Sequence, residues 1–216
     1  MDNQQANVER FNSVASEWED DPKRVRMGQE VGRAMRAALD LSGREKALEF
    51  GAGTGLVTLA MAPQLARVTA MDASAGMLAV LHGKCERGRL EHVDVVEGVV
   101  PAQLPDAQFD LIYSSMTLHH VEDVPGLLRQ LASHVVAGGQ IALADLDAED
   151  GHFHSGDVQG VAHHGFARDV FGGWLRDAGF GDVRFSTAFT VTKARDDGST
   201  HDYPIFLAVA RRGASA

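Results

Sequence analysis

The feature that most constrains the fold of this chain is a glycine-rich loop, Glu49-Phe50-Gly51-Ala52-Gly53-Thr54-Gly55-Leu56. It follows a short apolar run at 47–50 and precedes a helical pattern at 56–65. Three glycines allow the backbone to turn tightly and to approach a ligand closely, and the following helix offers unpaired N–H groups. The sequence therefore predicts a strand, a ligand-cradling loop and a helix in succession.

Short apolar runs alternate with longer amphipathic runs through the middle of the chain. We expect strands at 47–50, 67–71, 90–97, 109–114 and 141–146, with helices at 56–65, 75–84 and 125–136 between them, the last closed by Gly138 and Gly139. This order produces right-handed crossovers and a parallel sheet with helices on both faces. After a helix at 167–178, the two β-type runs at 182–192 and 203–211 are joined by only ten residues, which predicts an antiparallel hairpin.

The first forty residues carry a different, purely helical pattern. Phe11, Val14 and Trp18 share one helical face, and a second helical run occupies 24–41 after a break at Asp21-Pro22. We therefore expect an N-terminal helical cap at 1–42 and one compact Rossmann-like α/β domain at 43–216.

Composition excludes several classes of protein. With Cys85 as its one cysteine the chain has no disulfide framework, and no apolar run of about 18 residues is present to cross a membrane. The polar N-terminal stretch does not resemble a secretory signal, and a net charge of −10 disfavours a nucleic-acid partner. We expect a cytoplasmic protein with neither membrane nor nucleic acid as partner; the sequence leaves its oligomeric state open.

The charges around the loop indicate which ligand it cradles. Leu56 occupies the third-glycine position of a dinucleotide-binding loop, and Glu49, two residues before the first glycine, suits a cationic amine better than a pyrophosphate. Seventeen residues beyond Gly55, Asp72 ends the next strand, where a carboxylate can accept hydrogen bonds from both hydroxyls of a ribose. A nucleoside that carries an amino acid instead of phosphates fits this pattern, and S-adenosylmethionine is such a molecule.

Further motifs agree with that ligand. The loop, Met71-Asp72, the run FDLIYS at 109–114, LHH at 118–120 and GGQIALAD at 138–145 together resemble the class I S-adenosylmethionine-dependent methyltransferases. The resemblance is closest to the small bacterial methyltransferases of the type 11/12 group and runs from about residue 8 to 211. It implies a Rossmann-like, seven-stranded, mostly parallel sheet with a C-terminal antiparallel hairpin, S-adenosylmethionine as cofactor and S-adenosylhomocysteine as product.

The resemblance implies cofactor contacts along much of the chain. The glycines would pass beneath the methionine arm, Glu49 would hold its amine, and Asp72 would take the ribose hydroxyls. After the third strand this family usually has an acidic or polar side chain for adenine, whereas this chain has Val99, so a backbone carbonyl or a displaced Glu97 has to serve. The residues expected to bind the cofactor are Phe11, Trp18, Glu49, Gly51, Ala52, Gly53, Thr54, Gly55, Asp72, Ala73, Met77, Gly98, Val99, Ser114 and Ser115.

Histidines dominate the expected acceptor side of the site. His119 follows the fourth strand, and an imidazole there suits removal of a proton from the acceptor, the alternative being a packing role against the cofactor. The expected acceptor pocket contains Met116, His120, Asp147, His154 and His164. The histidines and aspartates at 145–164 could in principle bind a metal ion. Their spacing along the chain is not that of a regular metal site and no cysteine accompanies them, so we expect no metal site.

The acceptor itself is restricted only by exclusion. After the fourth strand, Ser114-Ser115-Met116-Thr117 lacks the proline-rich run of amino-methylating nucleic-acid enzymes and the paired glutamates of protein arginine methyltransferases, and Cys85 alone does not provide an arsenite site. We therefore expect a methyltransferase for a small molecule, with O, N, S and C all open as the methylated atom. The alternatives are an NAD-dependent oxidoreductase and a non-catalytic protein that binds S-adenosylmethionine.

Overall fold

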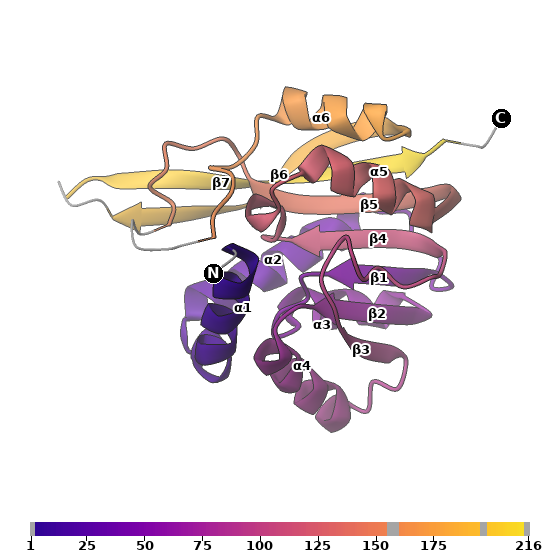
Figure 1. The fold of residues 1–216 in the computed structure, drawn as a ribbon, viewed down its shortest axis with the longest axis horizontal. Coiled ribbons are helices and arrows are strands. Elements are labelled where there is room, and N and C mark those ends of the chain that lie inside the picture. Colours follow the sequence, from indigo (N-terminus) through magenta and orange to yellow (C-terminus); the bar gives the residue numbers. More distant parts are fainter. Residues whose placement is uncertain (1–2, 155–159, 195–197, 214–216) are drawn as a thin grey trace.

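Seven strands form one sheet in the order β3-β2-β1-β4-β5-β7-β6 (Figure 1). The structure, a computed structural model, describes residues 3–154, 160–194 and 198–213. The strands are β1 Lys46–Phe50, β2 Arg67–Asp72, β3 Val93–Glu97, β4 Phe109–Ser115, β5 Val135–Leu146, β6 Phe180–Ala194 and β7 Thr200–Arg212. β1 to β5 pair in parallel, whereas β7 pairs antiparallel with both β5 and β6. The predicted fold class, including the C-terminal hairpin, is confirmed.

Helices cover both faces of this sheet. They are α1 Asn3–Val14, α2 Pro22–Ala38, α3 Leu56–Met61, α4 Ala75–Gly88, α5 Val124–His134 and α6 Arg168–Asp177, with 3-10 turns η1 Ala15–Asp20, η2 Ala62–Gln64 and η3 Leu118–His120. Buried apolar side chains of α2, α3 and α4 form one core with the sheet, and those of α5 and α6 form a second core. The central strands are apolar on both sides because each face is covered, as expected for a parallel sheet.

The N-terminal helices reach the edge of the sheet where the parallel strands end. Figure 1 shows α1 beside these carboxyl ends and beside the start of α4. Asn12 of α1 accepts hydrogen bonds from the Ser74 hydroxyl at 2.7 Å and from the Gly76 backbone N–H at 2.8 Å. Asp21 caps α2 by accepting from the backbone N–H of Lys23. The predicted helical character of this segment is therefore found, with a break at the predicted position.

The helix expected at 125–136 was placed wrongly at its C-terminal end. α5 ends at His134, and Gly138 and Gly139 lie inside β5 instead of closing a helix. Between the pairs Phe109–Val135 and Leu111–Gln140 the register of β4 and β5 shifts, so extra residues of β5 bulge out of the ladder. Gly138 takes the left-handed φ of +78° that this bulge needs, which only glycine adopts without strain.

Other boundaries differ from those predicted by a few residues. β6 and β7 are longer than expected, and β3 begins at Val93 because residues 90–92 form the turn after α4. α2 ends at Ala38, before the predicted end at 41. In the part of the chain that the structure describes, no helix has both the length and the apolarity needed to span a membrane.

Candidate functional site

A crevice opens between β1 and β4, where the strand order of the sheet reverses. β1 and β4 are neighbours, yet β2 and β3 lie on one side of this pair and β5 on the other. The loops that leave β1 and β4 therefore diverge at the carboxyl ends of these strands, the usual ligand position in such folds. One cavity lies there, with residues of both loops in its wall.

The glycine loop follows the wall of this cavity with left-handed backbone at all three glycines. A Cβ at Gly51 (φ +68°) would lie 2.0 Å from Oγ1 of Thr117, on the loop after β4. A Cβ at Gly55 (φ +84°) would lie 2.2 Å from Cδ1 of Leu81 in α4. Gly51 and Gly55 thus let the loop pack against its neighbours, whereas a Cβ at Gly53 would meet no atom within 4 Å.

Glu49 places a buried carboxyl group in the wall of the same cavity. Its side chain is 2% exposed, and its Oε2 atom has no hydrogen-bond partner among the described residues. Burial raises the pKa of Glu49 to about 8, against the opposite influence of the nearby Thr58 and Tyr113 hydroxyls, neither of which reaches hydrogen-bond geometry. A buried carboxyl with an unsatisfied oxygen is energetically costly, which marks it as a candidate for ligand binding.

Asp72 supplies a second carboxyl group in this wall. Its Oδ2 accepts the backbone N–H of Gly53 and its Oδ1 accepts the backbone N–H of Ser74, both at 2.8 Å. Burial raises the pKa of Asp72, although these N–H groups oppose the shift. The two hydrogen bonds fix the carboxylate between the glycine loop and the start of α4, and each of its oxygens keeps a further lone pair for a ligand.

Most of the predicted cofactor residues line this one cavity. They are Phe11, Trp18, Glu49, Gly51, Ala52, Gly53, Thr54, Asp72, Ala73, Met77, Gly98, Val99 and Ser115. Gly55 and Ser114 are not part of the wall: Gly55 is the N-cap residue that precedes α3, and the buried Ser114 hydroxyl donates to the carbonyl of Phe50 at 2.7 Å. These two residues support the wall from behind.

The N-terminal helices form the outer side of the cavity. The rings of Phe11 and Trp18 meet edge to face with centroids 5.7 Å apart, and the Arg24 guanidinium lies 4.1 Å from the centre of the Trp18 ring. Glu19 bonds to both the Thr54 hydroxyl and the Lys84 ammonium, which ties this segment to the glycine loop and to α4. No local pattern in the sequence predicts the contacts of Glu19, because they join three segments that are distant along the chain.

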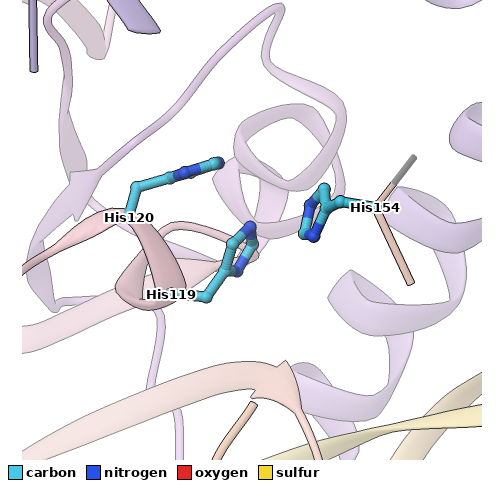
Figure 2. A group of neighbouring side chains, drawn as sticks. All are labelled: His119, His120 and His154. Carbon is cyan, nitrogen blue, oxygen red and sulfur yellow. The ribbon is translucent and has the colours of Figure 1, made fainter. Parts of the chain in front are cut away.

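A second cavity adjoins the first and contains the histidines. Phe11, Trp18, Arg24, Met27, Met116 and His120 line both cavities. Met116, with an unusual left-handed φ of 55°, turns the chain from β4 into η3. His119, His120 and His154 lie together in the second cavity (Figure 2).

His119 is held by a buried carboxylate. Its Nδ1 lies 2.7 Å from Oδ1 of Asp145, and the two side chains are 2% and 0% exposed. Burial by itself raises the pKa of Asp145. The neighbouring His119, together with hydrogen bonds from its side chain and from the backbone N–H groups of Leu146 and His119, outweighs this effect, so the pKa of Asp145 lies below its usual range. An ionised Asp145 fixes the proton of His119 on Nδ1, which leaves Nε2 free to accept a proton or bind a ligand.

Burial acts in the opposite direction on the other two imidazoles. Burial, together with the neighbouring His119, lowers the pKa of His120 to about 4 and that of His154 to about 3. Both rings are therefore neutral at pH 7.

Two residues predicted for the acceptor pocket lie elsewhere. Asp147 forms a two-point ion pair with Arg168, both contacts at 2.7 Å, and His164 lies on the surface 3.4 Å from Glu149. Neither is in the wall of either cavity. Of the histidines considered for a metal at 145–164, only His154 joins the group around His119.

The comparison with protein families bears directly on this arrangement. Residues 48–143 match a family described as "Methyltransferase domain". Residues 48–143 are a methyltransferase domain. This segment runs from β1 into β5 and contains the glycine loop, Asp72 and both histidines of η3, so the resemblance of its motifs to class I methyltransferases of the type 11 group is confirmed.

Curated relatives share the methyltransferase domain. An uncharacterized methyltransferase of Mycobacterium bovis is 32% identical over 103 residues, 47% of this chain and 50% of that protein. The demethylmenaquinone methyltransferase of Tropheryma whipplei is 31% identical over 113 residues, 52% of this chain and 46% of that protein. The chain thus spans about half the length of these curated relatives.

Solved structures share the fold over most of the chain. A structure of DhpI in complex with SAH superposes with a TM-score of 0.73 at 21% identity and covers 97% of this chain and 96% of that one. The YcgJ protein of Bacillus subtilis gives a TM-score of 0.69 at 15% identity and covers 86% of this chain and 99% of that one. The arrangement of the sheet and helices is therefore that of these proteins.

Proposed function

We propose that this protein transfers a methyl group from S-adenosylmethionine to a small organic acceptor. The observation that carries the proposal is a pair of carboxyl groups in one cavity on either side of the glycine loop, the buried Glu49 and the half-buried Asp72. Glu49 would hold the ammonium group of the methionine arm and Asp72 the ribose hydroxyls. The orphaned Oε2 of Glu49 fits this assignment because a bound ammonium would satisfy it.

The remaining walls suit the same ligand. The glycine loop offers backbone without side chains beneath the methionine arm, and the aromatic rings of Phe11 and Trp18 would cover the cofactor from the N-terminal cap. Ser115 and Met116 would line the floor toward the acceptor. Near adenine, the backbone N–H of Val99 is already bonded to the Gln103 side chain, so a backbone carbonyl or the Glu97 carboxylate would have to accept the adenine amino group.

The bound cofactor supplies an electrophilic methyl group on a positively charged sulfur. An acceptor lone pair would attack this methyl carbon in line with the carbon–sulfur bond, that bond would break, and S-adenosylhomocysteine would leave with the bonding electron pair on its sulfur. The chain aligns the acceptor and excludes water. An acceptor hydroxyl or ammonium must also lose a proton, and we assign its removal to Nε2 of His119, with Asp145 stabilising the resulting charge.

The second cavity supports a small acceptor that carries a negative charge. Its wall contains Arg10, Lys23, Arg24 and Lys193 but one carboxylate, Asp21, among the described residues. A demethylmenaquinone methyltransferase among the relatives supports a small-molecule acceptor in general. A panel of small acceptors with and without a carboxylate or phosphate tests this part of the proposal, and it fails if the neutral acceptors are consistently the better ones.

Calorimetry with S-adenosylhomocysteine tests the cofactor assignment. We expect binding by the wild-type protein and at least tenfold weaker binding by Asp72→Ala, since a hydrogen bond to a charged group contributes roughly 1.5–3 kcal/mol. Absence of binding, or equal binding by the variant, contradicts the assignment. An NADH titration followed by fluorescence tests the oxidoreductase alternative, and tight cofactor binding without turnover on any acceptor would favour a non-catalytic binding protein.

A further inference from the structure

Three imidazole rings from two distant segments meet at one point of the second cavity. His119 and His120 belong to η3 after β4, and His154 belongs to the segment after β5. One ring nitrogen from each residue lies within 4.8 Å of the other two (Figure 2). The centroid of the His119 ring is 4.2 Å from that of His120 and 5.0 Å from that of His154.

Two of these rings are oriented by hydrogen bonds on the opposite side. Nδ1 of His119 bonds to the Asp145 carboxylate at 2.7 Å, and Nδ1 of His120 donates to the carbonyl of Gly160 at 2.8 Å. In both rings the proton is therefore on Nδ1, and Nε2 carries a free lone pair. Metal-ligating histidines are held in this way, with the second ring nitrogen bonded to a carboxylate or to a backbone carbonyl.

The third ring, that of the half-buried His154, has one buried polar atom without a partner. Nδ1 of His154 is inaccessible to solvent and has no hydrogen-bond partner among the described residues. A buried polar atom without a partner costs free energy unless a ligand satisfies it. The orphan nitrogen of His154 and the two oriented rings therefore point to the same kind of occupant.

We propose that His119, His120 and His154 bind one divalent transition-metal ion, with Zn²⁺ as the best match. Three imidazoles and an open fourth position are a common zinc arrangement in catalytic sites. With metal–nitrogen distances of about 2.0–2.1 Å, tetrahedral coordination needs nitrogens about 3.4 Å apart. The separations here are at most 4.8 Å and so exceed that value by no more than about 1.4 Å, which small rotations of the partly exposed His120 and His154 can remove.

The open position of the ion faces a cavity with positively charged groups. Arg10 and Lys193 lie in its wall with the histidines, so an anionic oxygen of the acceptor is the natural fourth ligand. His120 also lines the proposed cofactor cavity, which places the ion between the two binding sites. A bound ion lowers the pKa of a coordinated hydroxyl. In the metal-bound protein His119 is a ligand and is not available as a base. The ion then promotes loss of the acceptor proton in place of the free His119 imidazole.

Metal titration of the full chain without an affinity tag tests the proposal. Zn²⁺ is titrated into chelator-treated protein in competition with a chromophoric chelator, and Co²⁺ spectra report the coordination geometry. We expect one ion per chain with a dissociation constant below about 1 µM, and visible Co²⁺ bands of tetrahedral intensity. His154→Ala should weaken binding at least about 100-fold, and Asp145→Asn about 10- to 100-fold through the orientation of His119.

Matched controls are exposed histidines outside the cluster, His82→Ala and His152→Ala, which should leave the affinity for Zn²⁺ unchanged. Binding of S-adenosylhomocysteine and thermal unfolding show that His154→Ala is folded, and they keep this test separate from that of the cofactor site. The proposal is overturned if the wild-type protein binds no ion when free Zn²⁺ is about 10 µM, tenfold above the expected upper limit of the dissociation constant of about 1 µM. It is also overturned if His154→Ala binds Zn²⁺ as tightly as the wild type.

Discussion

Nδ1 of His119 lies 2.7 Å from Oδ1 of Asp145, and both side chains are almost completely buried. Asp145 lies in β5, beside β4, and its carboxylate also accepts the backbone N–H groups of Leu146 and His119. The parallel pairing of β4 with β5 brings the end of one strand and the turn after the other into contact. The sheet thus fixes the orientation of an imidazole ring that faces the second cavity.

Replacing Asp145 with asparagine tests the importance of this contact for turnover. In the metal-free protein, where His119 is the proposed base, an amide in place of the carboxylate no longer stabilises a positive charge on His119 and does not hold its proton on Nδ1. We expect Asp145→Asn to lower kcat about 100-fold, the lower range for loss of acid–base catalysis, with little change in the affinity for S-adenosylhomocysteine. Steady-state kinetics and calorimetry measure the two quantities.

The control for Asp145→Asn is Asp110→Asn. Asp110 also accepts a backbone N–H, that of Lys46, but at the amino end of β4. Both variants lose a hydrogen-bonded carboxylate, so a general loss of stability affects both. Equal turnover in the two variants contradicts a specific role for the His119–Asp145 pair.

Replacing Asp72 with asparagine affects the cofactor and not the chemistry. One of the two carboxylate oxygens becomes an NH₂ group, which cannot accept the backbone N–H of Gly53 or Ser74. We expect the dissociation constant for S-adenosylhomocysteine to rise about 10- to 100-fold, corresponding to roughly 1.5–3 kcal/mol for a charge-assisted hydrogen bond. Asp94→Asn, one strand away and exposed beside Arg67, is the matched variant and should bind normally.

Features encoded within a short stretch of sequence were predicted correctly. The glycine loop, Asp72 and the hairpin each follow from local spacing, because turn chemistry and strand length act over a few residues. Thirteen of the fifteen residues that the resemblance to methyltransferases implied for the cofactor line one cavity, although their roles stay predictions. The helix end predicted at Gly138 and Gly139 was wrong, because such a glycine pair can either close a helix or permit a bulge, and the pairing of β4 with β5 decides between the two.

Contacts between distant segments were not accessible from sequence. Asp145 and His154 were both recognised as polar candidates, but nothing in their spacing indicates that both approach His119. Asp147 belongs to the same polar stretch and instead pairs with Arg168 at the start of α6. Two residues apart along a strand end, Asp145 and Asp147 meet different partners because tertiary packing determines which groups lie nearby.

Adding a methyl group at Gly51 should disturb the loop more than the same change in β5. Gly51 and Gly138 both have φ near +70 to +80°, but a Cβ meets Thr117 at 2.0 Å in the first case and no atom within 4 Å in the second. We expect Gly138→Ala to cost about 1 kcal/mol of stability from backbone strain alone. Gly51→Ala should cost a further 1–3 kcal/mol or so from the clash and weaken cofactor binding.

Urea denaturation and calorimetry compare the two alanine variants. Thr117→Ala in the Gly51→Ala background removes the two nearest clashing atoms, so it should restore part of the lost stability. Equal stability of Gly51→Ala and Gly138→Ala would mean that the loop after β4 moves freely, contrary to the close packing described above.

Replacing Glu49 with glutamine separates stability from binding. Burial raises the pKa of Glu49 to about 8 in the absence of ligand, from a usual value of 4.5. Between these two pH values the folded state holds a proton that the unfolded state has lost, so the free energy of unfolding decreases as the pH rises through this window. The glutamine variant lacks this titration and should be more stable than the wild type at pH 8, by at most about 4–5 kcal/mol, since the window from 4.5 to about 8 is worth roughly 1.4 kcal/mol per pH unit.

At pH 5 the wild-type carboxyl is protonated and the two proteins should unfold at similar urea concentrations. Glu45→Gln provides a control of opposite sign: slight burial opposes the shift, but hydrogen bonds from Ser42 and Gly43 hold the pKa of Glu45 below its usual value. That variant should therefore lose stability at pH 8.

Glu49→Gln should also bind S-adenosylhomocysteine more weakly, because an amide does not neutralise an ammonium group. If the free energies of unfolding of the wild type and of Glu49→Gln change in parallel from pH 5 to pH 8, Glu49 is ionised in the free protein. The cost in stability that we attribute to its burial would then be absent.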